Sequence, residues 1–151
     1  PPLRAVEVPA GHVALVPCSP SGEAVEWPGF LDLARALGDR AVVYTGPGER
    51  FDSPALTLEG RPLTEVAAAF RQASVVVVND SGLSHFARAL GVRTLVVHGS
   101  TDPGRTGAAG SEALFGSRPA CWPCYAKRCE RAPGGPAPCL DLPVQALLDR
   151  L

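Results

Sequence analysis

Four consecutive valines occupy positions 75–78 and restrict the fold of this chain more than any other feature. The run shows no alternation of polar and apolar residues, so it predicts a strand that is buried on both faces. Strands of this kind belong to parallel sheets that carry helices on both sides. The polar residues from Asn79 to Gly82 follow at once and mark the carboxyl end of the strand and the start of a helix.

Further apolar runs alternate with segments of helical spacing along the chain. Additional strands are predicted at residues 13–16, 41–44, 56–58 and 94–97. Helices are predicted at residues 28–37, 63–73 and 83–90. Because parallel neighbours need right-handed crossovers, this alternation predicts an α/β fold, a Rossmann-like doubly wound parallel sheet with strand order 3-2-1-4-5. Ligands of such sheets bind outside the carboxyl ends of the strands, where the strand order reverses.

The two ends of the chain depart from this alternation. Residues 1–11 contain three prolines and predict an extended lead-in or interdomain linker, so we expect the domain itself to span residues 12–151. The period is lost from residue 100 through a segment rich in cysteine and proline, and a helix is expected at residues 144–151. Because the sequence has no methionine, we expect that the native start lies upstream or was removed.

Composition excludes several classes of function. The 151 residues carry 14 basic and 15 acidic side chains, so no excess of positive charge favours nucleic acid. No apolar run approaches the roughly 20 residues of a transmembrane helix, and no signal peptide is visible, so we expect a cytoplasmic protein. Neither G-x-G-x-x-G after the first strand nor a P-loop motif is present, which disfavours a dinucleotide dehydrogenase and a P-loop ATPase.

The segment from Asn79 to His85 is the strongest candidate for a binding site. Asp80 or Ser81 is expected to cap the helix that follows the valine strand, and Gly82 lets a ligand approach the backbone. The free N–H groups and the positive end of the helix dipole favour an anion such as a diphosphate. The alternative is that Asp80 and Ser81 only cap a helix, and that His85 is a packed side chain.

Two other loops lie at the same predicted edge of the sheet. Glu49 follows a Gly-Pro-Gly turn after the second strand, where an acidic side chain commonly accepts hydrogen bonds from ribose hydroxyls. The loop at residues 99–107 offers the hydroxyl of Thr101 and the guanidinium of Arg105. A plain turn and a flexible surface loop remain the alternatives for these two segments.

Taken in order, residues 19–28, the turn before Glu49, the Asp-Ser-Gly-Leu-Ser-His segment at 80–85 and the Gly-Ser-Thr-Asp-Pro segment at 99–103 resemble the C-terminal half of lipopolysaccharide heptosyltransferases, glycosyltransferase family nine. The resemblance implies one half of a GT-B fold. It also implies an inverting transferase that moves heptose from an ADP-sugar to a lipid A-core acceptor without a catalytic metal. This chain would be the donor-binding half, and an N-terminal domain would hold the acceptor and the general base.

The resemblance also assigns roles to individual residues. The peptide N–H groups of residues 81–84 and the side chain of His85 would hold the diphosphate, Asp80 would contact the sugar and Glu49 would bind the ribose. The full expected donor site consists of Ser19, Glu49, Asp80, Ser81, Gly82, Leu83, Ser84, His85, Thr101 and Arg105.

One position departs from the family pattern. The family usually has Lys or Arg before the Trp-Pro pair, but Glu26 precedes Trp27 here, and its carboxylate would repel a diphosphate. Arg105 substitutes for that charge, or the donor differs, or activity is lost. Two hypotheses therefore stand: the donor domain of a transferase, whose isolated chain binds donor without transferring sugar, and a non-catalytic nucleotide-binding or assembly module.

Four of the five cysteines fall in the C-terminal part of the chain. Cys121, Cys124, Cys129 and Cys139 have a spacing compatible with a structural zinc ion, and reduced thiols or disulfides are the alternatives. Cys18, isolated in the loop after the first strand, is expected to be a passive lining residue.

Overall fold

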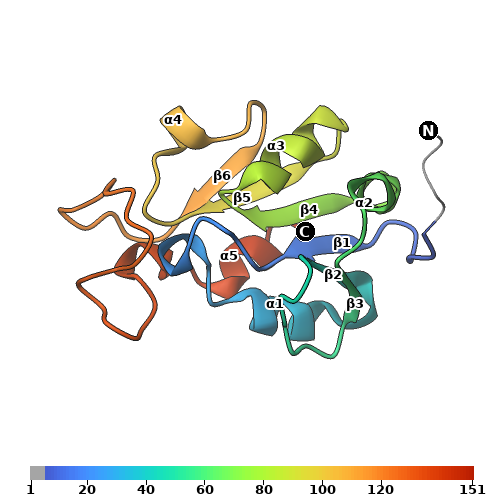
Figure 1. Cartoon of the computed structure of the whole chain (residues 1–151), viewed down its shortest axis with the longest axis horizontal. Coiled ribbons are helices and arrows are strands. Elements are labelled where there is room, and N and C mark those ends of the chain that lie inside the picture. The colour runs from blue at the N-terminus through green and yellow to red at the C-terminus, as the bar shows by residue number, and fades with distance from the viewer. Residues whose placement is uncertain (1–5) are drawn as a thin grey trace.

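The computed structural model describes residues 6–151. They contain a six-stranded sheet in which every pair of neighbouring strands is parallel. The strand order is β3-β2-β1-β4-β5-β6 (Figure 1). The strands are β1 (Val13–Val16), β2 (Ala41–Thr45), β3 (Leu56–Glu59), β4 (Val75–Asn79), β5 (Thr94–His98) and β6 (Glu112–Phe115). The order reverses between β1 and β4, as the sequence predicted.

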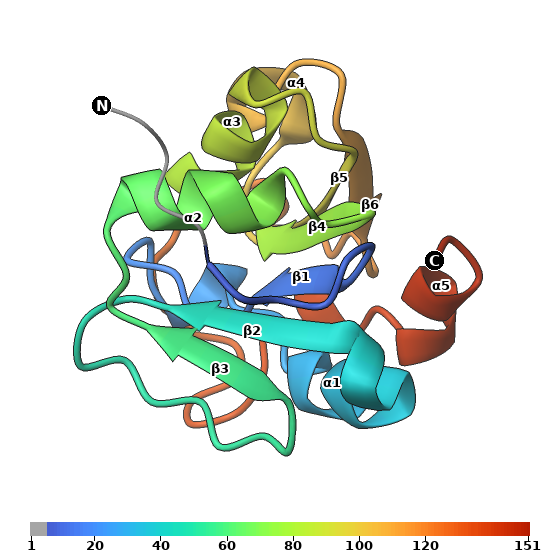
Figure 2. The same cartoon turned by 90° about the vertical axis from the view of Figure 1, so that its right-hand side faces the viewer.

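Helices cover both faces of this sheet (Figures 1 and 2). The α-helices are α1 (Phe30–Leu37), α2 (Leu63–Phe70), α3 (Gly82–Ala89), α4 (Pro103–Thr106) and α5 (Val144–Leu148). Short 3-10 helices are η1 (Glu23–Val25), η2 (Gly38–Arg40) and η3 (Pro138–Leu140). Helices α1 and α5 lie on one face, and α2 and α3 lie on the other. Across residues 6–151, none of the helices combines the length and apolar character needed to cross a bilayer.

The alternation of side chains along β1 explains the two cores. Val13 and Leu15 point to one face and pack with Phe30 of α1. Ala14 and Val16 point to the opposite face and pack with Phe70 of α2. Because each strand residue therefore contacts one of two apolar layers, uninterrupted apolar runs are required, and the central strands have them.

Besides the three short 3-10 helices, one strand and one α-helix were not predicted from the sequence. Strand β6 extends the sheet beyond β5, and α4 lies in the segment expected to be a loop. In β6 only Leu114 is buried, so the strand lacks the continuous apolar run that identified the others. Residues 6–9 have no regular secondary structure, and residues 1–5 of the expected lead-in lie outside the described part of the chain.

The side chain of Asn79, at the end of β4, connects the two halves of the sheet. Its Nδ2 donates a hydrogen bond of 2.6 Å to the carbonyl of Pro17, directly after β1, and its Oδ1 accepts one of 3.0 Å from the peptide N–H of Trp27. The Trp27 indole in turn donates to the carbonyl of Leu142. Asn79 is fully buried, so these bonds are shielded from water and fix the loop after β1 against β4.

We predict that Asn79→Ala lowers the free energy of unfolding by about 2–4 kcal/mol, because it leaves the buried Pro17 carbonyl and Trp27 N–H without partners. Urea unfolding followed by circular dichroism measures the loss. Gln72→Ala is the control, since it removes an exposed amide and is expected to cost less than about 0.5 kcal/mol. Equal stability of the two variants would contradict the role given to Asn79.

Candidate functional site

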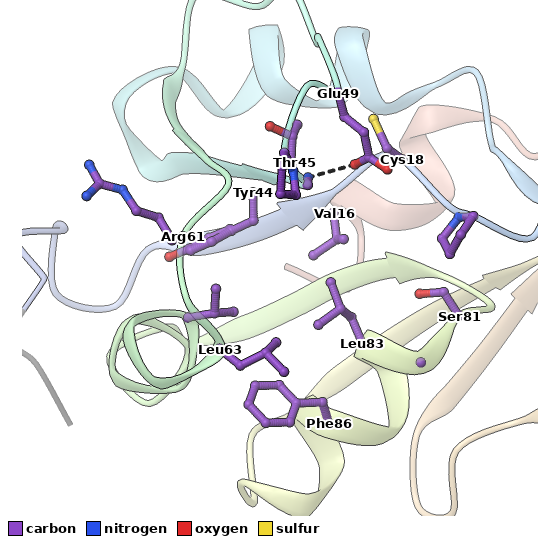
Figure 3. A pocket seen from close by; sticks show the side chains of 15 residues that line it. Val16, Cys18, Tyr44, Thr45, Glu49, Arg61, Leu63, Ser81, Leu83 and Phe86 are labelled. Carbon is purple, nitrogen blue, oxygen red and sulfur yellow. Dashed lines mark hydrogen bonds between the residues drawn. The ribbon is translucent and has the colours of Figure 1, made fainter. Parts of the chain in front are cut away.

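The main cavity of the structure opens at the carboxyl ends of β1, β2 and β4, between α2 and α3 (Figure 3). Its volume is about 570 Å³. Much of its wall is apolar and includes Val16, Tyr44, Leu63, Leu83 and Phe86. The cavity therefore lies at the reversal of strand order where the sequence placed the ligand.

Four residues of the expected donor site line this main cavity: Glu49, Ser81, Gly82 and Leu83. They come from two segments far apart in sequence, the turn after β2 and the N-terminus of α3. The turn after β2 positions Glu49, because the carboxylate Oε2 accepts a hydrogen bond of 2.7 Å from the peptide N–H of Gly46 (Figure 3). An ionised carboxylate has further lone pairs, so Glu49 retains the capacity to accept from the hydroxyls of a ligand.

The N-terminus of α3 differs in one respect from the expectation. Ser81 occupies the N-cap position, but neither its side chain nor that of Asp80 forms a capping hydrogen bond. The first-turn N–H groups therefore gain no side-chain partner from this segment. A Cβ atom built on Gly82 would meet nothing within 4 Å, which shows that the space in front of the helix is open.

Of the other two members of the segment, Ser84 stabilises the turn itself and His85 contacts α4. The hydroxyl of Ser84, fully buried, donates a hydrogen bond of 2.7 Å to the Ser81 carbonyl, and the Ser84 peptide N–H donates to the same oxygen at 3.0 Å. The Ser84 amide is therefore already engaged, contrary to its expected role in holding a diphosphate. His85 is exposed, and its Nε2 lies 3.1 Å from the carbonyl of Thr106.

Asp80 faces a buried polar network and is not among the residues that line the main cavity. Its Oδ2 accepts a hydrogen bond of 2.6 Å from the Thr106 hydroxyl and lies 3.5 Å from Nδ1 of His98. Burial alone would raise the pKa of Asp80, but the hydrogen bonds from His98, Thr106 and Thr101 and the charge of His98 lower it to about 2. Asp80 is thus an ionised group that ties β4 to β5 and α4.

The loop after β1 carries negative rather than positive charge. Glu26 Oε1 accepts a hydrogen bond of 2.7 Å from the peptide N–H of Ser19, so this carboxylate holds the loop closed. Ser19 itself is buried, and its hydroxyl accepts from the N–H of Ser21. Burial, together with the charges of Glu49 and Glu26, raises the pKa of the Cys18 thiol to about 11. Cys18 lines the main cavity as a neutral thiol, as expected.

The remaining expected residues lie beside a second cavity of about 330 Å³. Thr101 lines it, together with Ser100, Tyr125 and Lys127. Arg105 lies next to it, with its guanidinium 5.3 Å from the centre of the Tyr125 ring. The two cavities share Pro20, which places them side by side along the edge of the sheet.

Sequence reasoning missed several lining residues. Tyr44 and Phe86 were assigned only to a strand and a helix, although both line the main cavity. Tyr44 is held by its hydroxyl, which lies 2.8 Å from Nε2 of the buried His12. Arg61 also reaches the main cavity and pairs with Glu65 at 3.6 Å. Because side chains alternate between the two faces of a strand, the position of Tyr44 in β2 could have shown which face of the sheet it lies on. No pattern in the sequence identified Arg61 as a cavity residue.

Of the five cysteines, the four between residues 121 and 139 were expected to bind zinc, and this stays a prediction. All five are free thiols, and residues 6–151 contain no group of three or more His, Cys, Asp or Glu side chains arranged to hold a metal ion. Cys139 is buried in the core under α1, whereas Cys124 is exposed. Burial raises the pKa of the Cys139 thiol, and the electrostatic influence of Cys124, Cys129 and Cys121 raises it further.

Comparison with known proteins agrees with the resemblance found in the sequence. The profile of glycosyltransferase family 9 (heptosyltransferase) matches residues 5–133. Lipopolysaccharide heptosyltransferase 1 of Pseudomonas aeruginosa is 37% identical over 115 residues, which are 76% of this chain and 28% of the relative. The chain therefore spans less than one third of the length of this curated relative.

Solved structures show the same fold. The E. coli ADP-heptose lipopolysaccharide heptosyltransferase II superposes with a TM-score of 0.70 at 19% identity, over 93% of this chain and 45% of that one. The dodecameric iron-containing heptosyltransferase TibC, solved in complex with ADP-D-β-D-heptose, gives a TM-score of 0.69 at 18% identity, over 97% of this chain and 46% of that one. The α/β Rossmann-like fold of this chain is thus the fold of roughly half of each solved transferase.

We predict that Asp80→Asn lowers the free energy of unfolding at pH 7 by about 2 kcal/mol. The pKa of Asp80 is lower in the folded than in the unfolded chain, so its stabilisation is present above about pH 4 and is lost as the pH falls towards 2. Urea unfolding between pH 7 and pH 3 should show the gap between wild type and variant narrowing. Asp32→Asn is the control, because Asp32 is an exposed carboxylate that pairs with Arg35. A gap independent of pH would refute the assignment.

Proposed function

Because this chain belongs to glycosyltransferase family 9, we propose that it is the donor-binding domain of an inverting glycosyltransferase of lipopolysaccharide or cell-envelope glycan synthesis. The proposed donor is a nucleotide-sugar of the ADP-heptose type, the ligand named for the solved TibC complex. The observation that carries this proposal is the open N-terminus of α3 beside a largely apolar cavity. We place this function in the cytoplasm, where the sequence predicted it.

The proposed binding pose follows from the chemistry of the main cavity. A nucleobase is flat and largely apolar at its faces, so it suits the walls formed by Tyr44, Leu83 and Phe86. Glu49, held at the rim by the Gly46 amide, accepts from the ribose hydroxyls. The diphosphate then extends towards the N-terminus of α3, where the peptide N–H groups of Gly82 and Leu83 and the helix dipole favour anionic oxygens.

This pose gives the domain a role in the chemical step. When the glycosidic bond of the donor breaks, the nucleoside diphosphate leaves with additional negative charge on its terminal phosphate. Peptide N–H groups that are already oriented stabilise this charge without reorganisation. We propose that the acceptor, and the acidic residue that removes its proton, belong to a second domain of the same protein, which also agrees with the share of its relatives that this chain spans.

The alternative of a non-catalytic nucleotide-binding module is favoured by one observation. Glu26 stands where the family usually has a cation, and its carboxylate is committed to the Ser19 amide. A transfer assay on the complete protein separates the two functions. Release of ADP from ADP-heptose in the presence of an acceptor supports the transferase, whereas binding without turnover supports the module.

We predict that the chain binds ADP with a dissociation constant in the micromolar range and that Gly82→Val weakens this binding at least about tenfold. Gly82 has no positive φ and no neighbour within 4 Å of an added Cβ, so the variant keeps the fold while its side chain occupies the space in front of the helix. Isothermal titration calorimetry with ADP, UDP and GDP measures the affinity and the base preference.

Gly135→Val is the matched control, because Gly135 is equally open, has no positive φ and lies away from the main cavity. The control should bind ADP like the wild type. If Gly82→Val and Gly135→Val bind ADP equally, the diphosphate does not lie at α3. If none of the three nucleotides binds, the proposed function is wrong.

A further inference from the structure

The main cavity supplies little positive charge for a diphosphate. Glu49 lines it, and the negative charges of Glu49 and Glu26 both raise the pKa of the Cys18 thiol, which also lines it. Arg61, the one basic side chain among its lining residues, pairs with Glu65. Phosphate groups in proteins are usually met by Arg or Lys together with N–H groups. The charge that balances the diphosphate must therefore come from another part of the edge.

We propose that the second cavity, lined by Ser100, Thr101, Tyr125 and Lys127, is the subsite for the phosphate oxygens of the donor. Lys127 and the adjacent Arg105 supply the positive charge that position 26 lacks. The inference rests on the proposed function, in which the ligand is a nucleoside diphosphate. It assigns a binding role to the cysteine-rich arm, residues 121–139, which follows β6.

The position of the second cavity suits this role. It adjoins the main cavity at Pro20, so a ligand whose nucleoside fills the main cavity can extend into it. Thr101 lines the second cavity, and its hydroxyl lies 3.3 Å from Nδ1 of His98, which in turn lies 3.5 Å from the carboxylate of Asp80. Ser81 and Gly82 at the N-terminus of α3 line the main cavity, and Asp80, the residue before them, is linked through His98 to Thr101 at the second cavity. The hydroxyl of Ser21, which also lines the second cavity, offers a donor to phosphate oxygens.

Backbone hydrogen bonds fix the arm at this place. The N–H of Tyr125 donates to the carbonyl of Ser100 at 3.0 Å, and the hydroxyl of Ser100 donates to the carbonyl of Ala126 at 3.0 Å. The carbonyl of Lys127 accepts from the N–H of Ala24 at 3.1 Å. Gly22 permits the close approach, since a Cβ there would lie 2.6 Å from the Lys127 carbonyl oxygen. The backbone at Lys127 is thus held firmly, and only its flexible side chain has to reach the ligand.

The two cations are available for a ligand. Within residues 6–151, neither Lys127 nor Arg105 has a carboxylate within 4 Å, and both side chains are exposed. Arg105 stacks over the ring of Tyr125, which keeps its guanidinium near the cavity. The next residue in the arm, Arg128, is different, because it lies 3.9 Å from the carboxylate of Glu23. Arg128 therefore provides a control of equal charge on the same segment.

The test is isothermal titration calorimetry of ADP and adenosine with the whole chain. We expect Lys127→Ala to weaken ADP binding about tenfold and to leave adenosine binding unchanged, because only ADP carries the phosphates. The double variant Lys127→Ala/Arg105→Ala should bind ADP more weakly still. Arg128→Ala alone should bind ADP with an affinity within about twofold of that of the wild type. Since Lys127 is exposed, its variant should unfold at the same urea concentration as the wild type.

The outcomes separate this inference from the proposed function. If the wild type binds ADP and adenosine and Lys127→Ala binds ADP as tightly as the wild type, the second cavity is not the phosphate subsite, although the nucleotide site stands. If Lys127→Ala and Arg128→Ala weaken ADP equally, the effect is general charge and the subsite is refuted. If the wild type binds neither ligand, the proposed function fails and the subsite with it.

Discussion

The carboxamide of Asn79 is the interaction on which the binding edge depends. It joins the end of β4 to the carbonyl of Pro17 after β1 and to the N–H of Trp27 before α1. These groups meet where the strand order reverses, so one buried side chain sets the spacing between the loop after β1 and the N-terminus of α3. The main cavity lies between those two segments, and the second cavity begins where they meet the arm.

Charge is distributed unevenly along this edge. Carboxylates stand at the β1 and β2 side, where Glu26 and Glu49 each accept a hydrogen bond from a peptide N–H. Cations stand at the β5 side, where Lys127 and Arg105 lie beside a cavity rich in hydroxyls. A nucleoside diphosphate has a matching asymmetry, with neutral hydroxyls on the ribose and negative charge on the phosphates. We therefore propose that Lys127 and Arg105, from different segments, replace the cation that the family usually has before the Trp-Pro pair.

The sequence predicted those parts of the fold that local pattern controls. The four valines of β4 and the runs of β1, β2 and β5 identified the parallel sheet and the order 3-2-1-4-5, because strands that contact two apolar layers need continuous apolar residues. Glu49 and Gly82 were placed at the cavity by the same logic, since the carboxyl ends of parallel strands share one edge. Strand β6 was not predicted, because an edge strand with one buried side chain has no continuous apolar run.

What the sequence could not predict depends on contacts between distant residues. Asp80 was expected at the ligand, but Thr106 and His98 draw its carboxylate into a buried network. Lys127 gave no local signal, and only the hydrogen bonds between residues 125–127 and the loops after β1 and β5 bring it to the binding edge. The spacing of four cysteines predicts zinc, which stays a prediction, and the hydrogen bonds of residues 125–127 anchor the arm.

The most direct measurement is a crystal structure of this chain with ADP at saturating concentration. We predict density for the base against Tyr44 and Phe86, and for the diphosphate within hydrogen-bonding distance of the Gly82 and Leu83 peptide N–H groups. Density for the nucleotide at any other surface, or a main cavity that stays empty at saturation, would contradict this prediction.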